Sequence, residues 1–230
     1  MLILGIDDAG RGPVIGPMVL AGVLINWGDE TYMKEIGIRD SKMLTAKRRE
    51  FLAEKIKKIA LDYEIIKIEP KEIDGRNGVG INLNQIEAIK MAEIVNKIVE
   101  RYGKDKCKEE KIRVIVDCPS NNIKKWETYF EKHIENKKIL EIKAEWKADV
   151  NHVAVSAASI LAKTTRDAEI EKIKKHVGVD FGSGYSSDPI TCKFLQEYSS
   201  KFKKDGIFRE TWQTWKDVCN KKEQKKLGDF

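Results

Sequence analysis

Residues 2–17 of the chain read LILGIDDAGRGPVIGP. Residues 2–6 form a short apolar run, which predicts a buried strand that ends at two adjacent acids, Asp7 and Asp8. The glycines and prolines after the acids predict a loop. A second apolar run, residues 18–25, lies close enough in sequence to form a hairpin with the first strand. This stretch therefore predicts a strand that carries two carboxylates to the end of a sheet.

The rest of the chain alternates strands with helices, which is typical of an α/β fold with a mixed sheet between helices. A long helix rich in small residues is predicted over 149–175, where it can lie close against the sheet. Two further helices are predicted over 189–203 and 211–225, with no further strand. The other expected elements are helices at 41–60, 84–102 and 121–133 and strands at 63–68, 112–116 and 138–144.

Composition indicates a globular protein, and its mild positive charge permits a partner of negative charge without requiring one. The chain has 230 residues, 41% of them hydrophobic, and a net charge of +6. Residues 201–230 are the most basic stretch, with nine Lys or Arg against five acids; a solvated helix face is the alternative to phosphate contact there. Four cysteines without CxxC spacing, no leader-like N-terminus and no apolar segment of membrane length indicate a cytoplasmic protein, which we expect to be a monomer.

Four aspartates are candidate metal ligands. Adjacent carboxylates such as Asp7 and Asp8 repel each other, and a divalent cation is the usual compensation. Asp117 ends another apolar strand, although an Asp close to a proline also suits a turn. Asp149 precedes the long helix, where capping of the helix is the simpler interpretation. As a set of four, these oxygen ligands suit Mg²⁺ or Mn²⁺ and two-metal phosphoryl hydrolysis.

The sequence resembles the ribonuclease HII family in its archaeal form over nearly its whole length. The resemblance rests on these segments: GIDDAGRGPVIGP at 5–17, RDSK at 39–42, VD at 116–117, KAD at 147–149, VSAASILAK at 155–163 and GSGYSSDP at 182–189. It implies a ribonuclease H-like sheet over residues 1–180, which hold the catalytic site, and a helical substrate-binding region over 181–230. It also implies cleavage of RNA in RNA/DNA hybrids and 5′ to a ribonucleotide in duplex DNA, leaving 3′-hydroxyl and 5′-phosphate ends.

The same resemblance assigns residues to substrate. Gly10, Arg11 and Gly12 correspond to a Gly-Arg-Gly loop that reads the ribose 2′-hydroxyl, and glycines allow the close backbone approach that such contact needs. Tyr185 corresponds to an aromatic residue that packs on the next deoxyribose. Phosphate contacts or support of the site are implied for Arg39, Lys42 and Lys163.

The chain departs from the family's pattern at its second acid, which is usually Glu. Asp8 is one methylene shorter, so a bound metal would shift by about an ångström or be bridged by water. The last seven residues also resemble the motif by which repair proteins bind a sliding clamp. In this motif Gln224, Leu227 and Phe230 would occupy one face of a short helical turn; a frayed helix end is the alternative.

Other functions fit the sequence less well. Actin-like ATPases share a similar first strand but are longer and duplicate the domain, and ribonuclease HIII would be expected to carry an additional domain before the motif. A non-catalytic nucleic-acid-binding protein would explain the basic tail, but without metal the four acids would repel phosphate.

Overall fold

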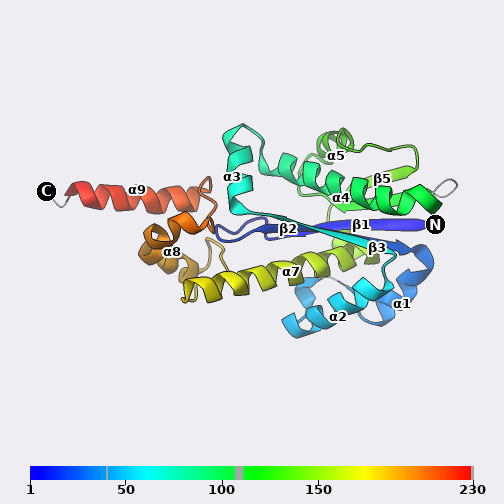
Figure 1. Cartoon of the computed structure of the whole chain (residues 1–230), viewed down its shortest axis with the longest axis horizontal. Coiled ribbons are helices and arrows are strands. Elements are labelled where there is room, and N and C mark those ends of the chain that lie inside the picture. The colour runs from blue at the N-terminus through cyan, green and yellow to red at the C-terminus, as the bar shows by residue number, and fades with distance from the viewer. Residues whose placement is uncertain (40, 107–110, 229–230) are drawn as a thin grey trace. The chain divides into compact units, whose positions relative to one another are not determined.

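The computed structural model describes residues 1–39, 41–106 and 111–228 and has one five-stranded sheet of order β3-β2-β1-β4-β5 (Figure 1). The expected mixed sheet is confirmed, since β1 pairs antiparallel with β2 and parallel with β4, and β4 pairs parallel with β5. The elements are β1 (Leu2–Ala9), β2 (Met18–Asn26), α1 (Glu30–Glu35), α2 (Ala46–Ile59), β3 (Asp62–Ile68), α3 (Pro70–Gly78), α4 (Leu83–Lys106), β4 (Ile112–Asp117), α5 (Ile123–Glu131), β5 (Leu140–Glu145), α6 (Ala148–Asn151), α7 (Val153–Val177), α8 (Pro189–Phe202) and α9 (Gln213–Gly228).

The chain groups into two compact units that interleave in sequence. The first holds residues 1–9, 19–67 and 83–165, and the second holds 10–18, 68–82 and 166–230. The Gly-Arg-Gly segment thus belongs to the same unit as the C-terminal helices. The proposed division at residue 180 describes functional regions and stays a prediction.

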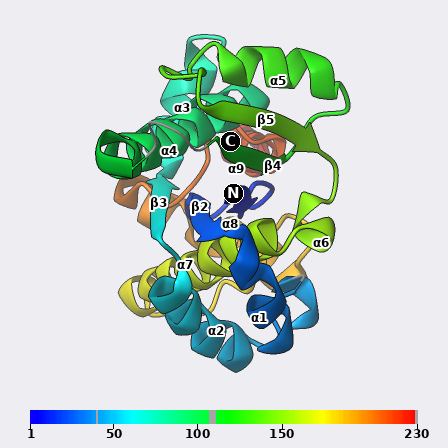
Figure 2. The same cartoon turned by 90° about the vertical axis from the view of Figure 1, so that its right-hand side faces the viewer.

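In the first unit, helices cover both faces of the sheet. Figure 2 shows α4 and α5 on one side, and α2 and the start of α7 on the other. Alternate residues of the central strands supply the two faces. Ile3 and Ile115 pack in the same cluster as α7, whereas Leu4 and Gly22 face Ile94 of α4. The small residues expected in the long helix serve close packing, because a side chain at Gly5 would overlap the backbone of Ala154.

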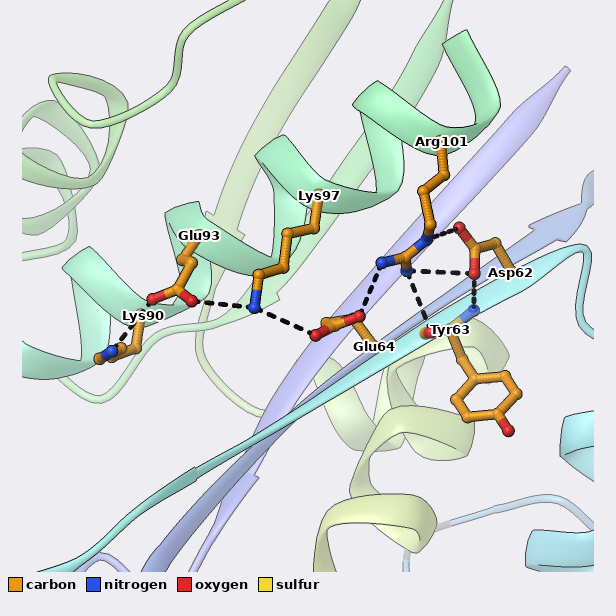
Figure 3. Close-up of polar contacts among 7 residues, drawn as sticks. All are labelled: Asp62, Tyr63, Glu64, Lys90, Glu93, Lys97 and Arg101. Atoms are coloured by element: carbon orange, nitrogen blue, oxygen red, sulfur yellow. Dashed lines mark hydrogen bonds and ion pairs between the residues drawn. The ribbon is translucent and has the colours of Figure 1, made fainter. Parts of the chain in front are cut away.

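Edge strand β3 is tied to α4 by ion pairs (Figure 3). Arg101 donates to both oxygens of Asp62 at 2.9 and 3.1 Å and to Glu64 at 2.8 Å, and Lys97 lies 3.3 Å from Glu64. The hydrogen bond to Asp62 is the main factor that raises the pKa of Arg101. Since these groups are partly exposed, each pair adds little stability. Arg101 also donates to the Tyr63 carbonyl at 3.2 Å, so one backbone group of the strand is bound by the same side chain.

The second unit has its own core, built largely from aromatic rings. Phe194 of α8 packs against Phe181, Phe202 and Phe208, and the rings of Phe208 and Trp215 stack with centroids 4.6 Å apart. This confirms the helical C-terminal region and shows that it folds around aromatic residues.

Several elements differ from their predicted form. Helices α1 and α3 were not expected, because neither segment has a long apolar stripe. Helix α2 has Thr45 as its N-cap, which accepts a hydrogen bond from the Arg48 amide at 3.3 Å, and it lies within the helix predicted over 41–60. The helix predicted over 149–175 is divided, since the backbone is extended at His152 between α6 and α7.

The last two expectations concern membrane-spanning segments and disulfides. Within the described ranges, no helix is long and apolar enough to cross a membrane. Cys118, Cys192 and Cys219 form no disulfide, as predicted, and Cys107 lies outside the described residues.

Candidate active site

The first two acids lie within β1, not beyond its end. Asp7 and Asp8 pair with Ala21 and Leu20 of β2, and the strand runs one residue past the acids at which it was predicted to end. The hydrogen-bonded ladder holds the strand in register there. Successive side chains of a strand point to opposite faces, and the acids follow this rule: Asp7 is 5% exposed, while Asp8 is half-buried. The two acids therefore differ in surroundings despite their adjacency.

The third acid lies beside Asp7 because of the parallel register of β1 and β4. Ile6 pairs with Val116, and this pairing ends one residue before the two acids, Asp7 and Asp117. Their carboxylates repel, since the charge of Asp117 raises the pKa of Asp7. Asp117 is held in place by the Ala148 amide, which donates to its Oδ1 at 2.8 Å. The end of β4 thus brings two of the predicted acids together.

Asp149 is a buried residue of the short helix α6, so its simpler interpretation as the N-cap of the long helix is wrong. It is 3% exposed, and it comes close enough to Asp117 to raise that residue's pKa. Its backbone carbonyl accepts a hydrogen bond from Ser156 at 2.6 Å. Lys147, just before α6, has a left-handed backbone with φ of 57°, a conformation that non-glycine residues adopt at a cost of about 1 kcal/mol or more. This bend positions Asp149 beside the sheet.

His152 caps the C-terminus of α6, three residues after Asp149. Its imidazole Nε2 makes a short contact with the carboxylate of Glu145. Burial would raise the pKa of Glu145, but hydrogen bonds from Lys143 and His152 outweigh it and hold that pKa below its usual range. His152 therefore has an acid partner of its own on β5.

Electrostatic repulsion links the four predicted acids, which are candidate ligands for divalent cations. Burial raises the pKa of Asp7 well above its usual value, and the charges of Asp8 and Asp117 raise it further. Burial and then Asp149 raise the pKa of Asp117. Lys42 is a cation at this site, with Nζ 3.4 Å from Asp149 Oδ2, but its side chain is 80% exposed. Like charges in this arrangement favour a bound cation.

The carboxylates are not drawn together as tightly as around a bound ion. Within the described ranges, no three or more His, Cys, Asp or Glu side chains meet the geometry of a metal-binding group. Asp7 receives hydrogen bonds from Ser159 and from the Asp8 amide, the latter at 2.7 Å, and these stabilise its charge in part. The donor set itself, carboxylate oxygens alone, suits Mg²⁺ or Mn²⁺.

The predicted Gly-Arg-Gly loop belongs to the second unit and is packed closely there. Gly10 has φ of 82°, and a side chain at this position would overlap the side chain of Arg166. A Cβ on Gly12 would lie 3.2 Å from Tyr185 Cε1. Gly10 is therefore required by its backbone conformation, whereas a side chain at Gly12 would need the Tyr185 ring to shift by a few tenths of an ångström.

Tyr185 lies against the Gly10–Gly12 loop. Its ring is 39% exposed, and the guanidinium carbon of Arg166 lies 5.6 Å from the ring centroid. The backbone before the ring is fixed, since the Gly184 amide donates to Thr191 at 3.0 Å and the Gly184 carbonyl accepts from the Val14 amide at 2.8 Å. An aromatic face is thus held beside Gly12 and open to solvent.

The remaining predicted substrate residues are more dispersed. Arg39 is exposed, Lys42 lies at Asp149, and Lys163 is half-buried on α7. Of the tail residues, Phe230 lies outside the described residues, and only the helical backbone of α9 is described at Gln224 and Leu227. The clamp-binding motif therefore stays a prediction.

Sequence reasoning missed the residues that contact the acids and those that contact the Gly10–Gly12 loop. Ser159 reaches Asp7, Arg166 contacts Gly10 and Tyr185, and Arg209 reaches the loop from the C-terminal region. Arg166 is buried, which lowers its pKa. For Arg209, which follows Ile207 and Phe208, the apolar neighbours were the available signal, but its partners could not be read from local patterns.

Comparison with known proteins identifies the family. Residues 4–215 match the family model described as Ribonuclease HII. The chain belongs to the ribonuclease HII family. It is 42% identical to the Ribonuclease HII of Methanococcus maripaludis strain C5, over 98% of this chain and 90% of that protein. It is 40% identical to that of Methanocaldococcus jannaschii, over 99% of both chains. As a member of this family it is an enzyme of the ribonuclease H class.

Solved structures of ribonuclease HII relatives confirm the fold. The ribonuclease H2 of Pyrococcus horikoshii superposes with a TM-score of 0.81 at 37% identity, covering 95% of this chain and 97% of that one. The structure of the PCNA:RNase HII complex from Archaeoglobus fulgidus has a TM-score of 0.77 at 37% identity, covering 94% and 96%. A ribonuclease HIII solved with Mn²⁺ has a TM-score of 0.79 but only 18% identity, covering 96% of this chain and 70% of that one, and so shows a shared fold alone.

Proposed function

We propose that this ribonuclease HII cleaves the RNA strand of RNA/DNA hybrids and also cuts 5′ to single ribonucleotides in duplex DNA, leaving 3′-hydroxyl and 5′-phosphate ends. Its cellular roles would be ribonucleotide excision and RNA primer removal in the cytoplasm. The observation that carries the proposal is the meeting of Asp7 and Asp117 at the ends of two parallel strands, with Asp149 beside Asp117. A non-catalytic binding protein has no need for buried acids that repel one another.

Asp7, Asp8, Asp117 and Asp149 would hold two Mg²⁺ or Mn²⁺ ions. When bound, such ions supply an activated water and neutralise the charge of the leaving oxygen. The chain's own part is to fix the ligands: the Ala148 amide orients Asp117, and Ser159 with the Asp8 amide orients Asp7. Exposed Lys42 would meet a substrate phosphate beside Asp149.

Recognition of the ribonucleotide is assigned to the Gly10–Gly12 loop and Tyr185. A 2′-hydroxyl both donates and accepts hydrogen bonds, and backbone groups of a closely approached loop can read it. The exposed ring of Tyr185 gives the following deoxyribose an apolar surface. Together they would select a ribonucleotide that is followed by DNA.

The test is a duplex with a single ribonucleotide, incubated with Mg²⁺, with Mn²⁺ or with EDTA. We expect cleavage 5′ to the ribonucleotide with either metal and none with EDTA. An all-DNA duplex of the same sequence should stay intact. Binding without cleavage in every condition would support the non-catalytic alternative, and equal cleavage of both duplexes would remove the role of Arg11 and Tyr185.

A sliding clamp is a second proposed partner, supported by the PCNA complex of the Archaeoglobus relative. The contact would use Gln224, Leu227 and Phe230. We expect the chain to bind a purified archaeal clamp, and Leu227→Ala with Phe230→Ala to abolish binding. Lys226→Ala is the matched control in the same tail. Equal binding by the double variant and the control would contradict the assignment.

A further inference from the structure

Arg209 is a buried arginine whose guanidinium is bound to the backbone of the Gly-Arg-Gly loop. Its exposed fraction is 0%. Nη2 donates to the Gly10 carbonyl at 2.6 Å, Nη1 to the Arg11 carbonyl at 2.7 Å, and Nε to the Gly16 carbonyl at 3.1 Å. The planar fork of an arginine can bind three carbonyls only when these have one fixed arrangement. The loop is therefore held in a single conformation at its first two residues.

Trp212 binds the third residue of the loop. Its indole Nε1 donates to the Gly12 carbonyl at 3.1 Å, and its ring centroid lies 5.0 Å from the guanidinium carbon of Arg209. Three consecutive carbonyls, those of Gly10, Arg11 and Gly12, are thus bound by two side chains of one C-terminal segment.

This arrangement determines which backbone groups of the loop point away from Arg209. The described residues contain no cis peptide bond, and in a trans peptide the N–H points opposite to the C=O. With the carbonyls of Gly10 and Arg11 turned toward Arg209, the amides of Arg11 and Gly12 point away from it. The peptide after Gly12 leads to Pro13, which has no N–H to present. The face opposite Arg209 therefore carries hydrogen-bond donors.

The segment that carries Arg209 and Trp212 is itself fixed. The Arg209 amide donates to the Val14 carbonyl at 2.9 Å. Asp74 of α3 accepts from the amides of Glu210 and Thr211 at 2.7 and 3.1 Å. Because both sides of the segment are held, Arg209 has little freedom to follow a moving loop.

We propose that Arg209 and Trp212 are positioning residues for ribonucleotide selection, which act by turning the carbonyls of the loop inward and its amides toward the ribose oxygen. The proposal rests on the proposed function of the loop. A buried arginine is costly in free energy, and an apolar residue would fill the same space more cheaply. The presence of this arginine is explained if a single conformation of the loop matters more for function than the stability lost by burying the charge.

Trp212→Phe is the sharpest test, because it removes one indole N–H and keeps an aromatic ring. KM and kcat would be measured on a duplex with one ribonucleotide. Selectivity would be measured as the ratio of the inhibition constants of unlabelled all-DNA and ribonucleotide-containing duplexes. We expect KM to rise and selectivity to fall, each about fivefold, with a smaller change in kcat.

Trp126→Phe is the matched control. Trp126 also donates its indole N–H to a backbone carbonyl, that of Asn84 at 3.0 Å, but in the other unit. The Trp126→Phe variant should have a lower melting temperature, as the Trp212→Phe variant should. Its KM and selectivity should equal those of the wild type. Arg209→Lys, which keeps the charge and loses the fork, should reduce selectivity more strongly than Trp212→Phe.

The possible failures are distinguishable. If the wild type selects the ribonucleotide and Trp212→Phe matches Trp126→Phe in KM and selectivity, the positioning role is overturned and the proposed function stands. A fall in kcat alone, at unchanged selectivity, overturns it as well. If the wild type itself fails to cleave or to select, the proposed function fails first, and the positioning role fails with it.

Discussion

The carboxylate cluster and the Gly10–Gly12 loop differ in the chemical groups that they present. The cluster gathers charged side chains, and burial with mutual repulsion raises the pKa of Asp7. The loop offers backbone groups instead, held by the buried fork of Arg209. Without a cation, repulsion between the acids costs free energy. The carbonyls of Gly10 and Arg11, in contrast, already have a hydrogen-bond donor within the protein. In the proposed function, chemistry would depend on charge, and recognition would depend on conformation.

Asp117→Asn tests the charged region and should have the largest effect. It removes a ligand charge with little change of shape, so we expect the cleavage rate with Mg²⁺ or Mn²⁺ to fall by roughly 10³-fold, or about 4 kcal/mol in barrier. Glu141→Gln on the exposed side of β5 is the control and should retain activity. A rate near wild type for Asp117→Asn would show that this acid is structural.

Tyr185→Ala tests the recognition region. Loss of the exposed ring should lower kcat/KM on a single ribonucleotide by roughly tenfold, the factor that corresponds to about 1.4 kcal/mol of lost apolar packing. Tyr185→Phe keeps the ring and should retain most of the activity. Equal kinetics for the Ala and Phe variants would exclude ring packing on the substrate.

Asp7→Asn should stabilise the metal-free protein while it destroys activity. A carboxyl whose pKa is raised by folding contributes stability below its unfolded pKa and loses it as the pH rises through the folded pKa. At pH 7 in EDTA, above the unfolded pKa, burial of this carboxyl costs free energy, and the neutral Asn should raise Tm by roughly 2–4 °C, as about 1 kcal/mol does at this size. Thermal melts at falling pH should show the difference shrinking; a lower Tm for the variant at pH 7 would contradict the repulsion.

Asp8→Glu should have the smallest effect. It restores the length usual in the family, so we expect activity to be retained or raised, with a changed ratio of rates in Mn²⁺ and Mg²⁺. Initial rates in each metal measure this ratio. Loss of cleavage in both metals would show that Asp8 is not equivalent to the family's second acid.

Local patterns carried much of the fold and the identity of the acids. The apolar run before Asp7, the strand before Asp117 and the cap at Thr45 each depend on neighbours a few residues away, which sequence alone displays. The same patterns misplaced Asp149, because the break between α6 and α7 depends on contacts with β4 and β5.

What the sequence by itself determined is the set of chemical groups: four aspartates, a Gly-Arg-Gly loop and a tyrosine. Only the tertiary structure decided the positions and orientations of these groups relative to their neighbours. The register of β1 and β4 sets Asp7 beside Asp117, and Arg209 turns the carbonyls of Gly10 and Arg11 inward. The reason is physical: such contacts join residues about a hundred or two hundred positions apart, and no local periodicity records which distant side chain a backbone carbonyl will meet.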